Sequence, residues 1–216
     1  WEESDPKLWD LLIEGDHLAP LLDFPLVADP GAEFNYSNFS TDLLGVIVAK
    51  ACDIDLDAFA AEHFLGPLDA RFGEWIRGEQ FHYPLIHLTP RTAARIAQLY
   101  LDDGVYAGKQ IVPSDWVSAS LANYSPDAWV TVERLDHAGR YLRDLGYGYQ
   151  WWQATVGDHR VDFAWGHGGQ FYGLVPDRNL VIVMTAYPAW LEHDAGNWSH
   201  ERAHLNLVGK FISLLP

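Results

Sequence analysis

Between residues 146 and 187 the sequence repeats one kind of short segment, and no other feature limits the possible folds as much. The segments "GYGYQWWQA", "RVDFAWG", "QFYGLV" and "LVIVMTAY" are rich in aromatic and β-branched residues. Turn-forming stretches such as "VGDH" and "PDRN" separate them. Short strands with tight connections pair with their neighbours along the chain, so this region is predicted to be a run of consecutive antiparallel strands.

The sequence before these strands has helical spacing. In "FNYSNFSTDLLGVIVAK", residues 34–50, the polar run Ser40–Asp42 is predicted to cap a helix. The apolar residues expected on its buried face are Leu43, Leu44, Ile47, Val48 and Ala51. In "HLTPRTAARIAQLYLDDG", Thr89 is predicted to cap a helix, Pro90 to occupy its first turn, and Gly104 to end it. A short helix is expected in "VPSDWVSAS".

The tail from Asn197 to Leu215 returns to helical spacing, with Leu205, Val208, Phe211 and Ile212 expected on its apolar side. Helices first, then a strand meander, then a closing helix predict an α+β protein. The predicted division places a mostly helical region in residues 1–140. The strands and the closing helix occupy 141–216, and the two regions together form one domain.

Composition excludes several classes of partner. The net charge of -16 opposes binding to nucleic acid and to anionic membranes, and it favours solubility. No stretch has membrane-spanning length. Because Cys52 is the single cysteine, it cannot form an internal disulfide.

Two short motifs could carry chemistry. Tyr36 and Asn38, two residues apart before a buried helix, could both point into a cleft, although a turn and a cap would look the same. The second motif is "GHGGQFYG", residues 166–173, at the head of a predicted strand. Its glycines would let a substrate approach the backbone and leave a main-chain N–H free for a developing oxyanion, with His167 beside it. A glycine-rich bulge between strands remains the alternative.

In this order, the two motifs resemble those of the penicillin-recognising serine hydrolases: class C β-lactamases, low-molecular-weight penicillin-binding proteins and related esterases and amide hydrolases. The resemblance extends over about residues 1–215 and includes "LTPRTAARIAQLYLDDGVYAGKQIVPSDWV" as a helical-domain segment. It implies a β-lactamase/transpeptidase-like fold, in which helices and a helical subdomain flank an antiparallel sheet. His-Gly-Gly stands where the penicillin binders carry Lys-Thr-Gly.

The resemblance also implies roles for single residues. Tyr36 would shuttle protons between nucleophile and leaving group, and Asn38 would bind the substrate's amide or acyl group. His167 would line the opposite wall. Gly168 and Gly169 would let the substrate lie along the strand, and the Gln170 N–H would be an oxyanion donor. No cofactor and no metal are implied.

The family's nucleophile is the serine of Ser-x-x-Lys at a helix start. The single match in this sequence is Ser4-Asp5-Pro6-Lys7. It lies too close to Tyr36, and Pro6 suits a turn. The chain is therefore expected to be a C-terminal portion of a serine hydrolase, without the first strands and the nucleophile helix, and inactive alone. Its sheet would have an open edge for the missing N-terminal segment or another copy of the chain.

The expected substrates are small-molecule esters, amides or β-lactams. His167 is mostly neutral at pH 7 and Gly168 has no side chain, so capture of a β-lactam carboxylate should be weak, which favours an esterase or amidase over a β-lactamase or D-Ala-D-Ala peptidase. The indoles of Trp151, Trp152 and Trp165 would either suit a flat acyl group or belong to the core. Family habit indicates a periplasmic or secreted location, with cytoplasmic exceptions.

Two alternatives stay open. One is a non-catalytic binding module of the same fold. The other is a zinc hydrolase, because His200-Glu201-Arg202-Ala203-His204 matches a zinc-protease pattern in which Glu201 is the base. No third ligand follows it, and the segment is otherwise expected to be an exposed, charged first turn of the closing helix.

Overall fold

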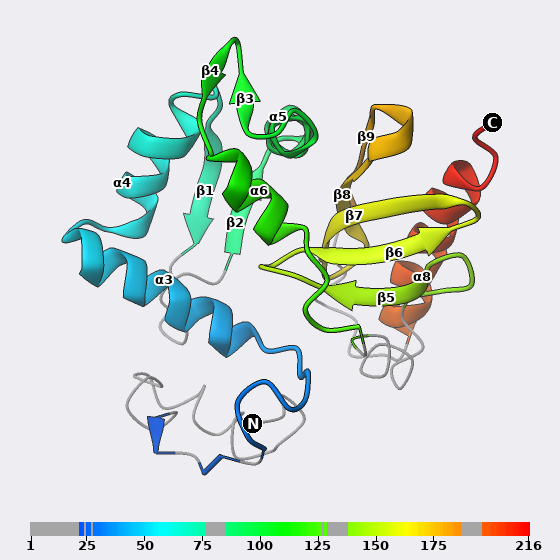
Figure 1. Ribbon diagram of the computed structural model, residues 1–216, viewed down its shortest axis with the longest axis horizontal. Coiled ribbons are helices and arrows are strands. Elements are labelled where there is room, and N and C mark those ends of the chain that lie inside the picture. The colour runs from blue at the N-terminus through cyan, green and yellow to red at the C-terminus, as the bar shows by residue number, and fades with distance from the viewer. Residues whose placement is uncertain are drawn as a thin grey trace. The chain divides into compact units, whose positions relative to one another are not determined.

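The computed structural model describes residues 22–23, 25–26, 28–76, 85–126, 128, 138–186 and 196–216 (Figure 1). The chain divides into two compact units, Trp1–Thr92 and Ala93–Pro216, and the boundary falls within helix α5 (Pro90–Leu101). The sequence predicted a different division, at residue 140, between a mostly helical region and a strand-rich region. That division into domains stays a prediction.

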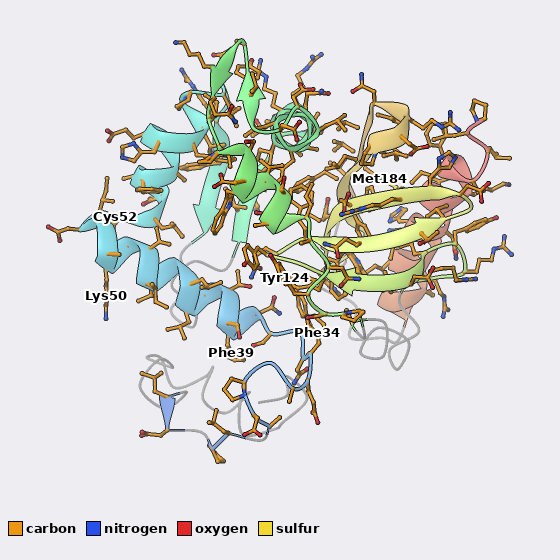
Figure 2. All side chains as sticks on the ribbon, viewed as in Figure 1. Phe34, Phe39, Lys50, Cys52, Tyr124 and Met184 are labelled. Atoms are coloured by element: carbon orange, nitrogen blue, oxygen red, sulfur yellow. The ribbon has the colours of Figure 1, made fainter. Side chains whose placement is uncertain are left out.

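The first unit contains helix α3 (Asn38–Cys52) and helix α4 (Leu56–Ala60), which continues as the π-helical turn η1 (Ala61–Leu65). Strands β1 (Phe72–Ile76) and β2 (Leu85–Leu88) form an antiparallel pair that the sequence patterns did not predict. At the far end of α3, Figure 2 shows Lys50 and Cys52. Cys52 is a free, exposed thiol.

Helix α3 corrects two predictions. Its N-cap is Ser37, whose Oγ accepts the Ser40 N–H at 3.3 Å, so the helix begins before the polar run that was expected to cap it. The buried residues of α3 are Phe39, Asp42, Gly45 and Val46, whereas Leu44 and Ile47 are 49% and 51% exposed. The buried stripe follows i, i+3 and i+7 spacing from Phe39, and the leucine- and isoleucine-rich face lies beside it.

Helix α5 begins as predicted. The Thr92 N–H donates to Thr89 Oγ1 at 3.1 Å, and Pro90 is the first helical residue. The chain leaves the helix at Gly104, which has φ +81° and lies so close to Val112 that a side chain would overlap its carbonyl. A small hairpin of β3 (Val105–Tyr106) and β4 (Lys109–Gln110) follows, and then α6 (Ser114–Ser120), the expected short helix.

A five-stranded antiparallel sheet dominates the second unit, with the order β5-β6-β7-β8-β9. Its strands are β5 (Arg143–Tyr147), β6 (Trp152–Val156), β7 (His159–Gly166), β8 (Gln170–Val175) and β9 (Leu180–Met184). The predicted meander is confirmed. One detail was wrong: "GYGYQWWQA" is not one strand but the hairpin between β5 and β6, which turns where the Gly148 N–H donates to Trp151 O at 2.9 Å.

Helices cover both faces of this sheet. On one face, Phe163 and Phe171 stack at 5.2 Å between ring centroids, and α8 (Gly196–Ile212) binds the same face through Trp165. Figure 1 shows α8 behind the strands. On the other face, Trp151 and Leu174 pack with Ala97 of α5. The apolar side of α8 buries Leu205, Val208 and Ile212, whereas Phe211 is half-exposed, contrary to the prediction.

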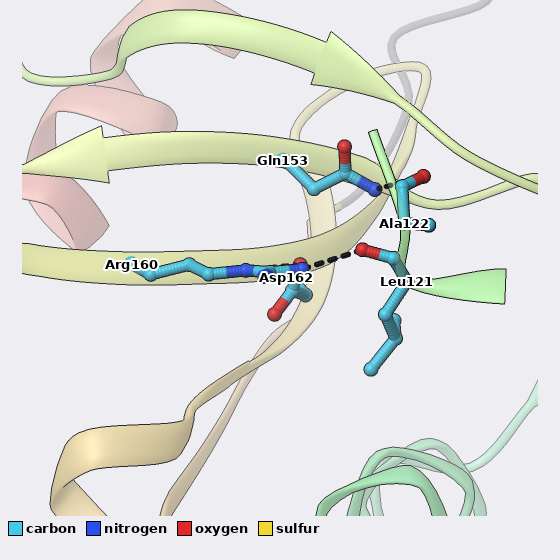
Figure 3. Close-up of polar contacts among 5 residues, drawn as sticks. All are labelled: Leu121, Ala122, Gln153, Arg160 and Asp162. Atoms are coloured by element: carbon cyan, nitrogen blue, oxygen red, sulfur yellow. Dashed lines mark hydrogen bonds and ion pairs between the residues drawn. The ribbon is translucent and has the colours of Figure 1, made fainter. Parts of the chain in front are cut away.

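A polar cluster ties the sheet to the loop after α6 (Figure 3). The Arg160 guanidinium pairs with the buried Asp162 carboxylate at 2.7 Å and also donates to Leu121 O. The amide of Gln153 donates to Ala122 O at 3.5 Å. Burial raises the pKa of Asp162, and the neighbouring Arg160 opposes this shift. The sheet thus holds this loop by charge as well as by packing.

Among the described residues, no helix combines the length and the apolar character needed to cross a membrane.

Candidate active site

The predicted Tyr-x-Asn motif forms the N-terminal end of α3 in the first unit. Ser37, between its two members, has extended backbone (φ -148°, ψ 120°) and caps the helix. The hydroxyl of Tyr36 donates to Asn38 Oδ1 at 3.4 Å. The helix cap therefore brings the Tyr36 phenol and the Asn38 amide together, as a site formed by both would require. The alternative interpretation of this motif was a turn and a helix cap, and the capping side chain is that of Ser37.

The His-Gly-Gly motif forms the turn between β7 and β8 in the second unit. Gly166 pairs with Gln170 across the two strands, and the Gly169 N–H donates to Gly166 O at 3.2 Å. Gly168 and Gly169 have φ +82° and +93°, the left-handed region that favours glycine. His167 is 36% exposed at the tip. The structure thus brings His167, Gly168, Gly169 and Gln170 together on one tight turn.

A buried carboxylate from α8 lies beneath this turn. The side chain of Glu201 is 2% exposed. Its Oε1 accepts the Trp165 indole N–H at 2.7 Å, and its Oε2 accepts the Gly168 N–H at 2.8 Å. Nδ1 of His167 lies 3.5 Å from the same Oε2. Glu201 was expected in an exposed, charged turn of the closing helix, and that expectation is wrong.

Burial of Glu201 raises the pKa of its carboxyl above the ordinary value. The Gly168 N–H, the nearby His167, the Trp165 indole and His204 all oppose this shift, but they do not outweigh it. An ionised Glu201 is therefore held at some cost in free energy, and the carboxylate is compensated by donors from the turn and from β7.

The two histidines of the zinc-protease pattern lie close together, with 4.2 Å between the ring centroids of His200 and His204. His204 Nδ1 is 3.3 Å from Gly168 O, so this ring also contacts the turn. Within the described part of the chain, no cluster of three or more His, Cys, Asp or Glu side chains could hold a metal ion. Both oxygens of Glu201 accept hydrogen bonds from the protein, which does not suit a general base on metal-bound water.

The side chain of Gln170 bonds the main chain of Ala186, just beyond β9. Its Nε2 donates to Ala186 O, and the Ala186 N–H donates to Gln170 Oε1 at 3.0 Å. The side chain is therefore committed to the sheet, which is compatible with a site role for the Gln170 backbone N–H alone.

The tryptophans near the site are mainly core residues. Trp151 and Trp152 are buried on opposite faces of the sheet, and the Trp152 ring lies 5.6 Å from that of Trp165. The indole N–H of Trp165 is bound to Glu201. The core interpretation of Trp151 and Trp152 is thus favoured over a role in holding an acyl group.

Comparison with known proteins identifies the family. The β-lactamase family model matches residues 3–188. The chain belongs to the β-lactamase family. Members of this family are the penicillin-recognising serine hydrolases, and the α+β architecture described above, with its antiparallel sheet between helices, is the β-lactamase/transpeptidase-like fold.

Solved structures with this β-lactamase-family fold agree. The chain is similar to simvastatin synthase (LovD) from Aspergillus terreus, with 15% identity, a TM-score of 0.65, and coverage of 97% of this chain and 64% of that one. It is similar to EstCE1, a hydrolase with promiscuous acyltransferase activity (14%, TM-score 0.57, 88% and 60%). It also resembles the octameric penicillin-binding protein homologue from Pyrococcus abyssi (16%, TM-score 0.56, 85% and 44%). The chain thus spans about half to two thirds of the length of these relatives.

The sequence interpretation gave other roles to two residues that contact the candidate site: Glu201 was the base of a zinc pattern, and Trp165 belonged to the core or lined an acyl group. In the sequence, Glu201 stood out only as part of a zinc-protease pattern. Two histidines four residues apart occur on many helices, so that pattern does not tell a metal site from any other helical segment. Nothing in the sequence indicated that its carboxylate would lie under a turn formed 33 residues earlier.

Proposed function

We propose that this chain supplies the Tyr-x-Asn segment and the His-Gly-Gly strand of a serine hydrolase that cleaves ester or amide bonds through an acyl-enzyme. The observation that carries this proposal is the tight turn at the head of β8, where two glycines in the left-handed region precede Gln170. Such a turn leaves room for a substrate backbone beside the strand. Membership of the family supports the same chemistry.

In this proposal Tyr36 carries the proton between the nucleophile and the leaving group, and Asn38 binds the substrate's amide or acyl oxygen. The ordinary pKa of a tyrosine is about 10, so Tyr36 needs a nearby cation to act as a base at neutral pH. Gly168 and Gly169 flank the substrate, the Gln170 N–H stabilises the oxyanion, and His167 lines the opposite wall.

The nucleophile in this proposal is the serine of a Ser-x-x-Lys outside these 216 residues. The only Ser-x-x-Lys in the sequence is Ser4–Lys7, which lies outside the described residues. The 216-residue chain alone should then neither hydrolyse an ester nor be labelled by a fluorophosphonate, whereas a longer protein that contains it should do both. Labelling of the isolated chain that disappears in Ser4→Ala would refute this assignment.

The proposed substrates are esters or amides without an obligatory carboxylate. His167 and Gly168 provide neither the fixed cation nor the hydroxyl that would bind the carboxylate of a β-lactam. The test compares kcat/KM of the longer protein for a short-chain p-nitrophenyl ester and for a cephalosporin. Faster turnover of the cephalosporin would favour a β-lactamase or D-Ala-D-Ala peptidase. Binding without turnover of either compound would favour a binding module.

The proposed partner is a strand from the rest of the protein or from another copy of the chain. Strand β9 is an edge of the five-stranded sheet, and no strand of the described residues pairs with its outer side. An unpaired edge exposes a row of N–H and C=O groups that another strand can bind. If the strand comes from the rest of the protein, mixing the chain with a separately expressed N-terminal segment should give one stable complex on size exclusion.

A further inference from the structure

One turn of α8 holds both backbone polar groups of a single glycine in the His-Gly-Gly turn. Glu201 Oε2 accepts the Gly168 N–H at 2.8 Å, and His204 Nδ1 lies 3.3 Å from Gly168 O. Because a carbonyl oxygen only accepts, the His204 ring makes this bond with the proton on Nδ1. Glu201 and His204 are three residues apart on the helix, so both reach the turn from the same face.

The groups that bind Glu201 can only donate. The indole N–H of Trp165 and the backbone N–H of Gly168 have no acceptor function, and they occupy different oxygens of the carboxyl group. A carboxylate satisfies both at once, whereas an amide of the same shape would turn its own NH₂ group toward one of them. The two donors thus match the two oxygens of one carboxyl group, although burial opposes its ionisation.

The same helix also limits the backbone of the next residue. A Cβ placed on Gly169 would lie 2.5 Å from His204 Nδ1, so the turn and the ring are already in close contact. The imidazole of His167 points back toward the carboxylate, with 3.5 Å between Nδ1 and Glu201 Oε2. Two side chains of α8 therefore hold His167 and Gly168, and His204 leaves no room for a side chain at Gly169.

We propose that Glu201 is a positioning residue of the candidate site: its carboxylate fixes the Gly168 backbone and orients His167, and so aims the N–H of Gln170 at the substrate. This inference rests on the proposed function for the role of Gln170, but the contacts that define the clamp do not depend on it. In this proposal, Glu201 and His204 of the zinc-protease pattern hold the His-Gly-Gly turn and do not bind a metal.

The energetic cost of Glu201 agrees with a role in geometry. Burial disfavours its ionised form despite the compensating groups around it, which are the Gly168 N–H and His167 on the turn, Trp165 on β7 and His204 on α8. A buried charge held at a cost is weak evidence for stability, and keeping it agrees with a role in fixing a conformation. Residues that organise active sites often have this property.

The test is Glu201→Gln, with Asp162→Asn as the matched control. Asp162 is another buried carboxylate whose pKa is raised by burial, but it pairs with Arg160 and does not bind the turn. In ¹⁵N-labelled protein, Glu201→Gln should shift the Gly168 amide and Trp165 indole resonances and accelerate hydrogen exchange at Gly168 by about tenfold or more. Asp162→Asn should leave these signals in place.

Activity gives the second measurement, made on the longer protein with an ester substrate. Loss of alignment of an oxyanion donor lowers kcat more than it raises KM, and we expect a kcat about 10- to 100-fold lower in Glu201→Gln. The Asp162→Asn control should keep the wild-type kcat. If Glu201→Gln does not fold, Trp165→Phe removes one donor and retains an aromatic ring, and it should still shift the Gly168 amide.

The outcomes separate the two proposals. Unchanged Gly168 signals in Glu201→Gln, or a kcat equal to that of the wild type, would overturn the positioning role. A shifted turn in a protein that hydrolyses no ester or amide would support the clamp and reject the proposed hydrolase function.

Discussion

Replacing Gly169 by alanine tests the geometry of the His-Gly-Gly turn most directly. Gly169 has φ +93°, which an L side chain rarely adopts. The added Cβ would also lie 2.5 Å from His204 Nδ1 and 2.8 Å from His204 Cβ. Gly169→Ala therefore introduces backbone strain and steric overlap at the same residue.

The two effects have different magnitudes. Strain of the left-handed backbone costs roughly 1–2 kcal/mol for a residue with a Cβ. Displacing the His204 ring costs about 1–3 kcal/mol by overpacking. Loss of its bond to Gly168 O adds about 1 kcal/mol. We expect Gly169→Ala to lower the free energy of unfolding by about 3–6 kcal/mol, which corresponds to a fall in Tm of roughly 6–24 °C for a domain of this size.

The assay is urea unfolding followed by tryptophan fluorescence, with Gly157→Ala as the matched control. Gly157 also has positive φ (+60°), but nothing lies within 4 Å of the Cβ it would gain, so this variant measures strain alone. It should lose only about 1–2 kcal/mol. A double variant with His204→Ala should recover at least about 1 kcal/mol, because removing the ring removes the overlap with Nδ1, while the 2.8 Å approach to the retained Cβ of residue 204 remains.

Equal losses in Gly169→Ala and Gly157→Ala would refute the reasoning, because the ring contact would then contribute nothing. Strict additivity with His204→Ala would refute it independently.

Three further predictions concern the second unit. Phe163→Ala should lower the unfolding free energy by about 3–5 kcal/mol, because Phe163 is fully buried against Phe171; a loss below about 1 kcal/mol would contradict its place in the core. Arg160→Ala should cost about 1–3 kcal/mol at pH 7, measured by urea unfolding. Much of this loss should be recovered at acid pH, because a protonated Asp162 needs no cation beside it and burial already raises the pKa of this carboxyl. Equal losses at both pH values would contradict the pairing of Arg160 with an ionised Asp162. Burial also raises the pKa of Glu201, so its contribution to stability is complete below the ordinary pKa and is lost as pH rises through the folded-state value. The Tm advantage of wild type over Glu201→Gln should therefore shrink from pH 4 to pH 7, and a gap that widens would reverse the sign of this argument.

The sequence predicted the order of elements well because their signals are local. Thr89 and Pro90 start α5 by capping chemistry that needs no tertiary contact. The strands β7 to β9 alternate with turn residues in a way that only short antiparallel pairs satisfy. These patterns depend on neighbours along the chain, so they can be recognised without a structure.

Other features depend on contacts between distant residues and could not be predicted. The buried face of α3 runs through Phe39 and Asp42 instead of Leu44 and Ile47, although the latter are the more apolar pair. Glu201 has the local sequence of an exposed helical turn, yet its carboxylate is buried by donors on β7 and on the turn. The motifs around Tyr36 and His167 were found in the local sequence, the resemblance implied their roles, and their joint role in catalysis stays a prediction.

The amide of Gln170 bonds both main-chain groups of Ala186, as another strand would. Glutamate at this position could accept but not donate, lysine could donate but not accept, and asparagine would be shorter by one methylene. In a saturation library selected for folding, residue 170 should therefore tolerate almost no replacement. Its neighbour in the site, His167, lies at the half-exposed tip of the turn and should accept many residues until the selection also demands catalysis.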